Sequence, residues 1–150
     1  MKSILIVISL LFSAVTVSGQ QVFHVFPENH KTNPGKASGN GSIVNPWDLQ
    51  TALSQNTNAV NDNDVIYLHE GIYNGRFIST ITTLDKNTFI TVKPFKRDKV
   101  VLNGNVDSKL GSVLEVKGGN VIFQDLEITF LGDFSRSMKD RNFQVVNGIS

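Results

Sequence analysis

The sequence predicts an all-β protein built as a parallel β-solenoid, and three observations lead to this fold class. Segments that begin at Asp64, Thr88 and Ser112 share one pattern of polar, apolar and basic positions, at a constant spacing of 24 residues. The apolar runs are short and are separated by Gly, Pro and Asn, which is typical of strands and turns. Only one segment has the apolar spacing of a helix. A repeat of this period is typical of folds in which each unit stacks on the previous one.

The first 19 residues have the features of a secretory signal peptide: a positive charge at Lys2, an apolar run over residues 4–17 and small residues before Gln20. We expect cleavage before Gln20 and a secreted mature chain, extracellular, periplasmic or at the cell surface. A membrane anchor is the alternative. The apolar run is shorter than the roughly 20 residues that cross a bilayer, and no later run is long enough, so we expect no membrane span after signal removal.

Composition narrows the function classes further. The chain has no cysteine, so its stability must come from packing and backbone hydrogen bonds rather than disulfides. Its formal charge of +1 gives no indication of a nucleic-acid partner. The length suits one domain, and we expect a monomer.

The mature chain is predicted to begin with a strand and a loop, over residues 20–44. Residues 22–26 are apolar enough for a short strand, whereas residues 27–46 are rich in Asn, Gly, Ser, Pro and Lys. A loop of this length is either functional or wraps one end of a domain.

One helix is predicted, over residues 45–54. Asn45 is suited to cap it and Pro46 to occupy its first position. An apolar stripe follows at Leu49, Ala52 and Leu53. We expect this helix to cover the open first turn of the solenoid, because an exposed sheet edge invites aggregation.

From residue 64 onward the pattern alternates between strand and turn. The predicted strands lie at 65–68, 89–92, 100–102, 113–116, 121–130 and 143–149. The two-residue alternation changes phase at Gln124-Asp125, which indicates a bend or bulge. Residues 131–142 form a polar insertion that breaks the period.

Stacking of these units predicts two inward ladders. They are Ile66, Ile90 and Leu114, and Leu68, Val92 and Val116. Tyr67, Thr91 and Glu115 then point outward by two-residue alternation. A leucine-rich repeat lacks support because its Leu and Asn pattern is absent, and a β-sandwich would not hold a constant register over three units.

Two segments carry a family resemblance. Asn45–Leu53 and Asp64–Gly75 resemble the capping helix and the entry into the first coil of secreted right-handed parallel β-helix proteins of the pectate-lyase-like superfamily, although Asn63 stands where the family usually has Gly. The resemblance implies that residues 45–150 are the first coils of such a domain, incomplete at the C-terminus. It also implies that catalytic residues lie on later coils. The family includes lyases and hydrolases of acidic polysaccharides and proteins with no established activity, and Ca²⁺ is a cofactor that the resemblance implies.

A lyase needs a base, and a cation such as Ca²⁺ or Arg to neutralise the uronate carboxylate. Lys93, Lys117 and His69 are candidate bases, because they occupy equivalent positions of the 24-residue repeat and would form a row. The basic segment 93–97 could hold an anionic sugar. The alternative is that these residues only mark solvated strand ends and turns.

Other chemistries have weaker support. A glycoside hydrolase needs two carboxylates on one face, but Asp62 and Asp64 precede a strand and look like turn residues. Their oxygen atoms could bind Ca²⁺, yet no ligand spacing indicates a site. His24, His30 and His69 are far apart in the sequence and show no metal-binding spacing.

Sugar binding is expected at aromatic and basic positions. Among the aromatic residues, Tyr67 is expected to face outward, and Trp47 to be buried between the helix and the first coil; Tyr73 is a further candidate for stacking on sugars. Loops that interrupt a solenoid often carry function, so the insertion is the preferred region for a site. The predicted substrate-binding residues are Tyr67, Lys93, Arg136 and Arg141. The predicted function is action on an acidic polysaccharide, with a polysaccharide lyase as the expected enzyme class; the alternative is a non-catalytic glycan-binding or cell-surface adhesive protein.

Overall fold

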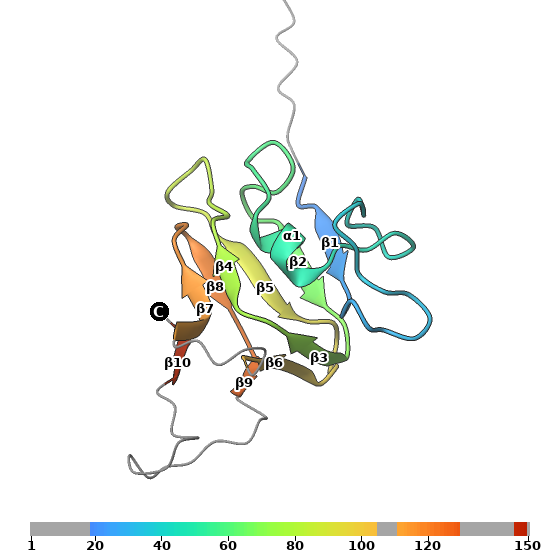
Figure 1. Ribbon diagram of the computed structural model, residues 1–150. Helices are drawn as coiled ribbons and strands as arrows, with labels where there is room; N and C mark the ends of the chain where they lie inside the picture. Colours follow the sequence, from blue (N-terminus) through green and yellow to red (C-terminus); the bar gives the residue numbers. More distant parts are fainter. Residues whose placement is uncertain (1–18, 105–110, 130–145, 150) are drawn as a thin grey trace, which may run out of the picture.

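A computed structural model describes residues 19–104, 111–129 and 146–149 (Figure 1). Strands dominate these residues, and every strand pairing is parallel. The predicted all-β class is therefore confirmed. The signal-peptide region up to residue 18 and the predicted insertion at 131–142 lie outside the described residues.

The strands form three parallel sheets. The first sheet contains β1 (Val22–Val25), β2 (Val65–Leu68), β5 (Ile90–Pro94) and β8 (Val121–Phe123). The second sheet contains β3 (Gly71–Asn74), β6 (Val100–Asn103) and β9 (Glu127–Thr129). The third sheet contains β4 (Phe77–Ser79), β7 (Gly111–Val116) and β10 (Val146–Ile149). From β2 onward the chain visits the first, second and third sheet in that order, three times.

The register between strands differs from the predicted 24-residue repeat. Ile66 pairs with Val92 rather than Ile90, and Val92 pairs with Phe123. Leu114 lies in β7, which belongs to the third sheet and pairs with β4 and β10. Both predicted ladders are therefore wrong. The turns between strands differ in length, so strands with the same apolar pattern fall in different sheets.

The predicted bend at Gln124-Asp125 is confirmed. The run expected over 121–130 divides into β8 and β9, which belong to different sheets. Asp125 has a φ of 55°, in the left-handed region that turns the chain sharply.

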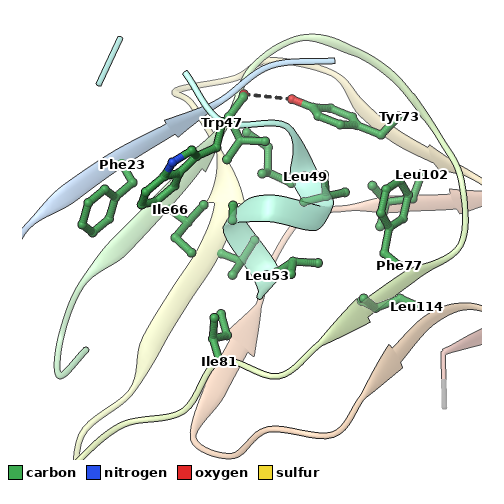
Figure 2. Packing of buried hydrophobic residues seen from close by; sticks show 14 of the residues in the cluster. Phe23, Trp47, Leu49, Leu53, Ile66, Tyr73, Phe77, Ile81, Leu102 and Leu114 are labelled. Atoms are coloured by element: carbon green, nitrogen blue, oxygen red, sulfur yellow. Dashed lines mark hydrogen bonds between the residues drawn. The ribbon is translucent and has the colours of Figure 1, made fainter. Parts of the chain in front are cut away.

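Apolar side chains from all three sheets meet in one core (Figure 2). Ile66, Leu102 and Leu114, one from each sheet, are almost completely buried there. The helix α1 (Leu49–Leu53) adds Leu49 and Leu53, which Figure 2 shows within the same cluster. The helix contacts β4, the edge strand of the third sheet, as expected of a covering element.

The helix begins later than predicted. Asp48, not Asn45, is its cap: the Asp48 carboxylate accepts hydrogen bonds from the backbone N–H and the hydroxyl of Thr51, each at 2.7 Å. Asn45 instead closes a turn, where its backbone N–H donates to Ser42. Pro46 precedes the helix, because the chain at Trp47 is extended and bridges to β1.

Candidate functional site

A row of outward side chains crosses the first sheet. The register places His24 beside Tyr67, and Tyr67 beside Lys93. Ile66 and Leu68, on either side of Tyr67, are fully buried, so the alternation along β2 directs Tyr67 outward as predicted. Two of the four predicted binding residues, Tyr67 and Lys93, are thus neighbours.

Phe95, directly after β5, completes an aromatic cluster over this row. Its ring centroid lies 5.3 Å from that of Tyr67, in an edge-on arrangement, and 5.7 Å from that of His24. The ammonium nitrogen of Lys93 lies 5.8 Å from the centre of the Tyr67 ring, within the range of a cation–π contact. Aromatic faces and a cation therefore share one surface.

A cleft of about 500 Å³ opens beside this row. Its lining combines one aromatic ring, one proline, three cations, one amide and two carboxylates: Tyr67, Pro94, Lys93, Lys96, Arg97, Gln124, Asp98 and Asp125. Lys96, like Asp125, has a positive φ, so sharp turns after β5 and β8 help to form the cleft. The basic segment predicted at 93–97 supplies three of its cations.

Two histidines meet at the end of this row. His24 Nδ1 lies 2.9 Å from His69 Nε2, and His69 Nδ1 lies 3.6 Å from a carboxylate oxygen of Asp98. The same oxygen accepts the backbone N–H of Glu70 at 3.2 Å. His24 and His69 are far apart in the sequence, and the pairing of β1 with β2 brings them into contact.

His69 is held between aromatic rings and is only 8% exposed. Its ring stacks on Phe26, with centroids 3.9 Å apart, and lies 4.7 Å from Phe95. Burial lowers the pKa of His69 to about 4; the neighbouring His24 adds to this decrease, and Asp98 opposes it. Burial also lowers the pKa of His24. Both imidazoles are therefore neutral at pH 7.

These contacts assign the protons of the neutral pair. Asp98 favours a proton on His69 Nδ1, which leaves His69 Nε2 as an acceptor. His24 Nδ1 must then donate to it. The other ring nitrogen of His24, Nε2, carries a lone pair, has no hydrogen-bond partner among the described residues and is not one of their buried unpaired atoms. This nitrogen is therefore not completely buried, and Tyr67, the neighbour of His24 in the register, lines the cleft.

The predicted row of basic residues does not form. Lys117 follows β7 in the third sheet, where its ammonium group lies 3.4 Å from Glu115. His69 is buried, so Lys93 is the member of that set that lines the cleft. The other two predicted binding residues, Arg136 and Arg141, lie outside the described residues.

The aspartates considered for Ca²⁺ hold turns instead. Asp62 accepts backbone N–H groups from Leu84 and Asp85, and Asp64 accepts those of Gln21 and Asn61. Oδ1 of Asp62 and both carboxylate oxygens of Asp64 are thus engaged by backbone N–H groups. Across residues 19–104, 111–129 and 146–149, no group of three His, Cys, Asp or Glu residues could hold a metal ion.

Two other aromatic residues considered for sugar binding are structural. Trp47 is 5% exposed, stacks on Phe23 and donates its indole N–H to the Gly39 carbonyl. Its burial was predicted, although it packs on β1. Tyr73 is also buried, and its hydroxyl lies within hydrogen-bond distance of the carbonyls of Val25 and His69. Figure 2 shows one of these hydrogen bonds as a dashed line.

Comparisons with known proteins identify no relative: no family model, no curated protein and no solved structure matches the chain. In the described part of the chain, no helix is long and apolar enough to cross a membrane. The resemblance to pectate-lyase-like β-helix proteins stays a prediction. The cleft is the feature of the structure that bears on function.

Proposed function

We propose that the chain is a secreted parallel β-solenoid that binds acidic polysaccharide in the cleft beside Tyr67 and Lys93. The solenoid is supported by the order in which the chain visits three parallel sheets. Secretion is supported by the predicted signal peptide before Gln20. A monomer is sufficient, because every residue of the cleft comes from one chain.

The single observation that carries this proposal is the chemistry of the cleft lining. The half-buried Tyr67 ring offers an apolar face with a polar tip, on which a sugar ring can stack. Lys93, Lys96 and Arg97 provide positive charge for uronate carboxylates. Gln124 offers both a donor and an acceptor for hydroxyl groups.

The direction of the row suits a polymer. His24, Tyr67 and Lys93 lie on adjacent strands, which are spaced about 4.8 Å apart. A glycan chain that runs across the strands would therefore meet a new side chain at each strand. The carboxylates of Asp98 and Asp125 on the same cleft would repel misplaced acidic groups and so favour one register.

Binding requires only these residues, so we propose binding as the main function and catalysis as the second candidate. A lyase is the second candidate, because it needs in addition a base beside the bound uronate, and the neutral His24 adjoins the cleft.

Titration of the full-length chain with polygalacturonate and alginate, and with neutral dextran as a comparison, tests the proposal. We expect binding to the two polyuronates only, and binding that weakens as salt is added. Lys93→Ala should weaken binding about five- to tenfold by loss of one cation. Tyr67→Ala should do the same by loss of the stacking face.

Lys117→Ala is the matched control, since Lys117 directly follows β7 of the third sheet and is not among the residues that line the cleft. Its affinity for polyuronate should equal that of the unchanged chain. Equal affinity for dextran and polyuronate, or full affinity after Lys93→Ala, would contradict the proposal.

A further inference from the structure

Each of the three sheets has an edge strand that comes earliest in the chain, namely β1, β3 and β4. Other parts of the chain close two of these edges. Along β1, the N–H of Phe26 donates to the carbonyl of Trp47 at 3.1 Å. Along β4, the side-chain amide of Gln50 binds both backbone groups of Ile78. An edge closed in this way cannot pair with another strand.

The edge of β3 is different, because no described residue binds its outer backbone groups. The N–H groups of Gly71 and Gly75 donate to carbonyls of β6 and of the residue before it. Backbone groups along a strand point alternately to its two sides, so those of Ile72 and Asn74 point away from β6. In the described part of the chain, the N–H and C=O of Ile72 and the N–H of Asn74 have no hydrogen-bond partner.

The loop that follows β1 reaches the start of β3 but does not pair with it. Pro27 packs against Gly71, where an added Cβ atom would lie 2.8 Å from the proline ring. Proline has no N–H, so this loop residue offers the edge no donor. The edge is therefore left open from Ile72 onward.

A pocket of about 140 Å³ lies beside this open edge, between β3, α1 and the loop. Ile72 and Asn74 line it together with the apolar side chains of Leu49 and Phe77. Glu28 is the charged residue of the lining; it is exposed and makes no hydrogen bond or ion pair with the described residues. Pockets for drug-sized ligands have about 300–1,000 Å³, so this one is sized for a single side chain.

We propose that the β3 edge and this pocket bind an extended peptide segment of a partner protein, with a lysine side chain in the pocket. In this mode of recognition, backbone hydrogen bonds give affinity and pockets for alternate side chains give specificity. The inference does not rest on polysaccharide binding, because the pocket and the cleft share no residue.

The backbone of the peptide would extend the second sheet by one strand, about 4.8 Å from β3. Two of its carbonyls accept the N–H groups of Ile72 and Asn74, and one of its N–H groups donates to the carbonyl of Ile72. Side chains alternate along a strand, so the neighbours of the lysine face outward. There they lie beside the Ile72 side chain, which is 43% exposed, and apolar neighbours suit this position.

The lysine is assigned from the two kinds of group in the pocket. Its methylene stem packs on Leu49 and Phe77, while its ammonium group meets the Glu28 carboxylate at the rim. An acidic side chain in the same place would face a like charge. Because Glu28 is exposed, the ion pair contributes more to selectivity than to affinity.

Amide NMR of the full-length chain, titrated with the peptide acetyl-Thr-Val-Lys-Val-Thr-amide, tests the proposal. Without peptide, the amides of Ile72 and Asn74 should exchange with solvent faster than the amide of Tyr73, which faces β6. The peptide should shift the signals of the two outer amides and slow their exchange, with saturation below about 5 mM.

Methylated peptides separate strand pairing from unspecific adhesion. One analogue carries a methyl group on the lysine nitrogen of the backbone, and the other carries methyl groups on the two valine nitrogens. Only alternate N–H groups face β3, so one analogue should bind about tenfold more weakly and the other should keep its affinity within about twofold.

Charge variants test the pocket. Glu28→Gln should weaken binding about two- to fivefold, and glutamate in place of the peptide lysine should weaken it more. Glu70→Gln is the matched control, because Glu70 is exposed and directly precedes β3 but does not line the pocket. Its affinity should equal that of the unchanged chain. Full affinity after Glu28→Gln would overturn the assignment of the lysine.

Four results would overturn the edge as a peptide site. The first is no response of the Ile72 and Asn74 amides at about 5 mM peptide. The second is equal affinity for both methylated analogues. The third is slow exchange of both amides before peptide is added, which would show that the chain itself covers the edge. The fourth is protection that rises with protein concentration alone, which would assign the edge to a second copy.

Discussion

The burial of the His69 side chain is the feature of the site that the sequence predicts least well. His69 follows an apolar strand in the place where the other repeats have Lys, and this pattern indicated an exposed basic position. In the structure Phe26 and Phe95 enclose it, and both come from outside its own strand. Their positions depend on strand pairing, which the local sequence does not reveal.

The burial of His69 makes stability depend on pH. Its pKa is about 4 in the folded chain and about 6.5 when unfolded, so between these values the unfolded state binds more protons. The stabilisation is therefore present above pH 6.5 and is lost as the pH falls toward 4. The largest loss expected from this group is about 3 kcal/mol, and the lowered pKa of His24 acts in the same direction.

Urea unfolding at several pH values between 7 and 4 measures this effect. His69→Gln removes the titrating group, so the difference in unfolding free energy between the unchanged chain and this variant should shrink as the pH falls. Aspartate and glutamate titration is common to both proteins and cancels in the difference. A difference that stays constant with pH would show that His69 keeps an ordinary pKa.

At the scale of elements, α1 is too short to be stable alone and depends on its contacts. Gln50 illustrates this: its side-chain amide accepts the Ile78 N–H and donates to the Ile78 carbonyl, at 3.0 and 2.9 Å. The amide thus occupies the place of a neighbouring strand beside β4, the edge of the third sheet. The helix satisfies backbone groups that would otherwise form an open edge.

The existence of this helix could be predicted, but its first residue could not. The apolar stripe at Leu49, Ala52 and Leu53 is a local signal, and all three side chains are buried. Asn45 and Asp48 are both acceptable caps by residue type. The choice between them depends on the bridge from Trp47 to β1, which keeps the chain extended up to Asp48.

Substitution of the two candidate caps distinguishes them. Asp48→Ala removes both hydrogen bonds to Thr51 and should lower the unfolding free energy by about 1–2 kcal/mol. Asn45→Ala should change it by less than about 0.5 kcal/mol, because its backbone N–H makes the turn. Chemical unfolding measured by circular dichroism compares the two. A larger loss for Asn45→Ala would place the helix start at the earlier residue.

At the scale of the molecule, most strands could be predicted, whereas β3, β4 and the pairing of the strands could not. β2 was predicted with its observed bounds, because the alternation of buried and outward residues is local. β5 and β7 share the pattern of β2, yet only β5 pairs with it. Any short strand with an inward apolar face fits any of the three sheets, so turn lengths and core packing decide its place.

The candidate site also combines features that the local sequence predicts with features that depend on strand pairing. The outward directions of Tyr67 and Lys93 were predictable from alternation within each strand. The contact between His24 and His69 was not, since it needs the pairing of β1 with β2 across a long loop. If the register of β1 with β2 had been known, the polar residues at matching positions of these strands would have indicated the contact.

Engineered cysteine pairs test the register directly, and the chain has no cysteine of its own to interfere. Tyr67 pairs with Lys93 in the structure, whereas the 24-residue repeat would pair it with Thr91. Directly paired positions on adjacent strands are about 4.8 Å apart, which a disulfide can bridge. Thr91 is paired with Val65, which lies two residues before Tyr67 in β2, so the distance between Thr91 and Tyr67 should be about 8 Å, too long for a disulfide. We therefore expect Tyr67→Cys with Lys93→Cys to form an intramolecular disulfide under mild oxidation, as measured by thiol alkylation and mass spectrometry. The pair Tyr67→Cys with Thr91→Cys should keep both thiols, and the opposite result would restore the constant repeat.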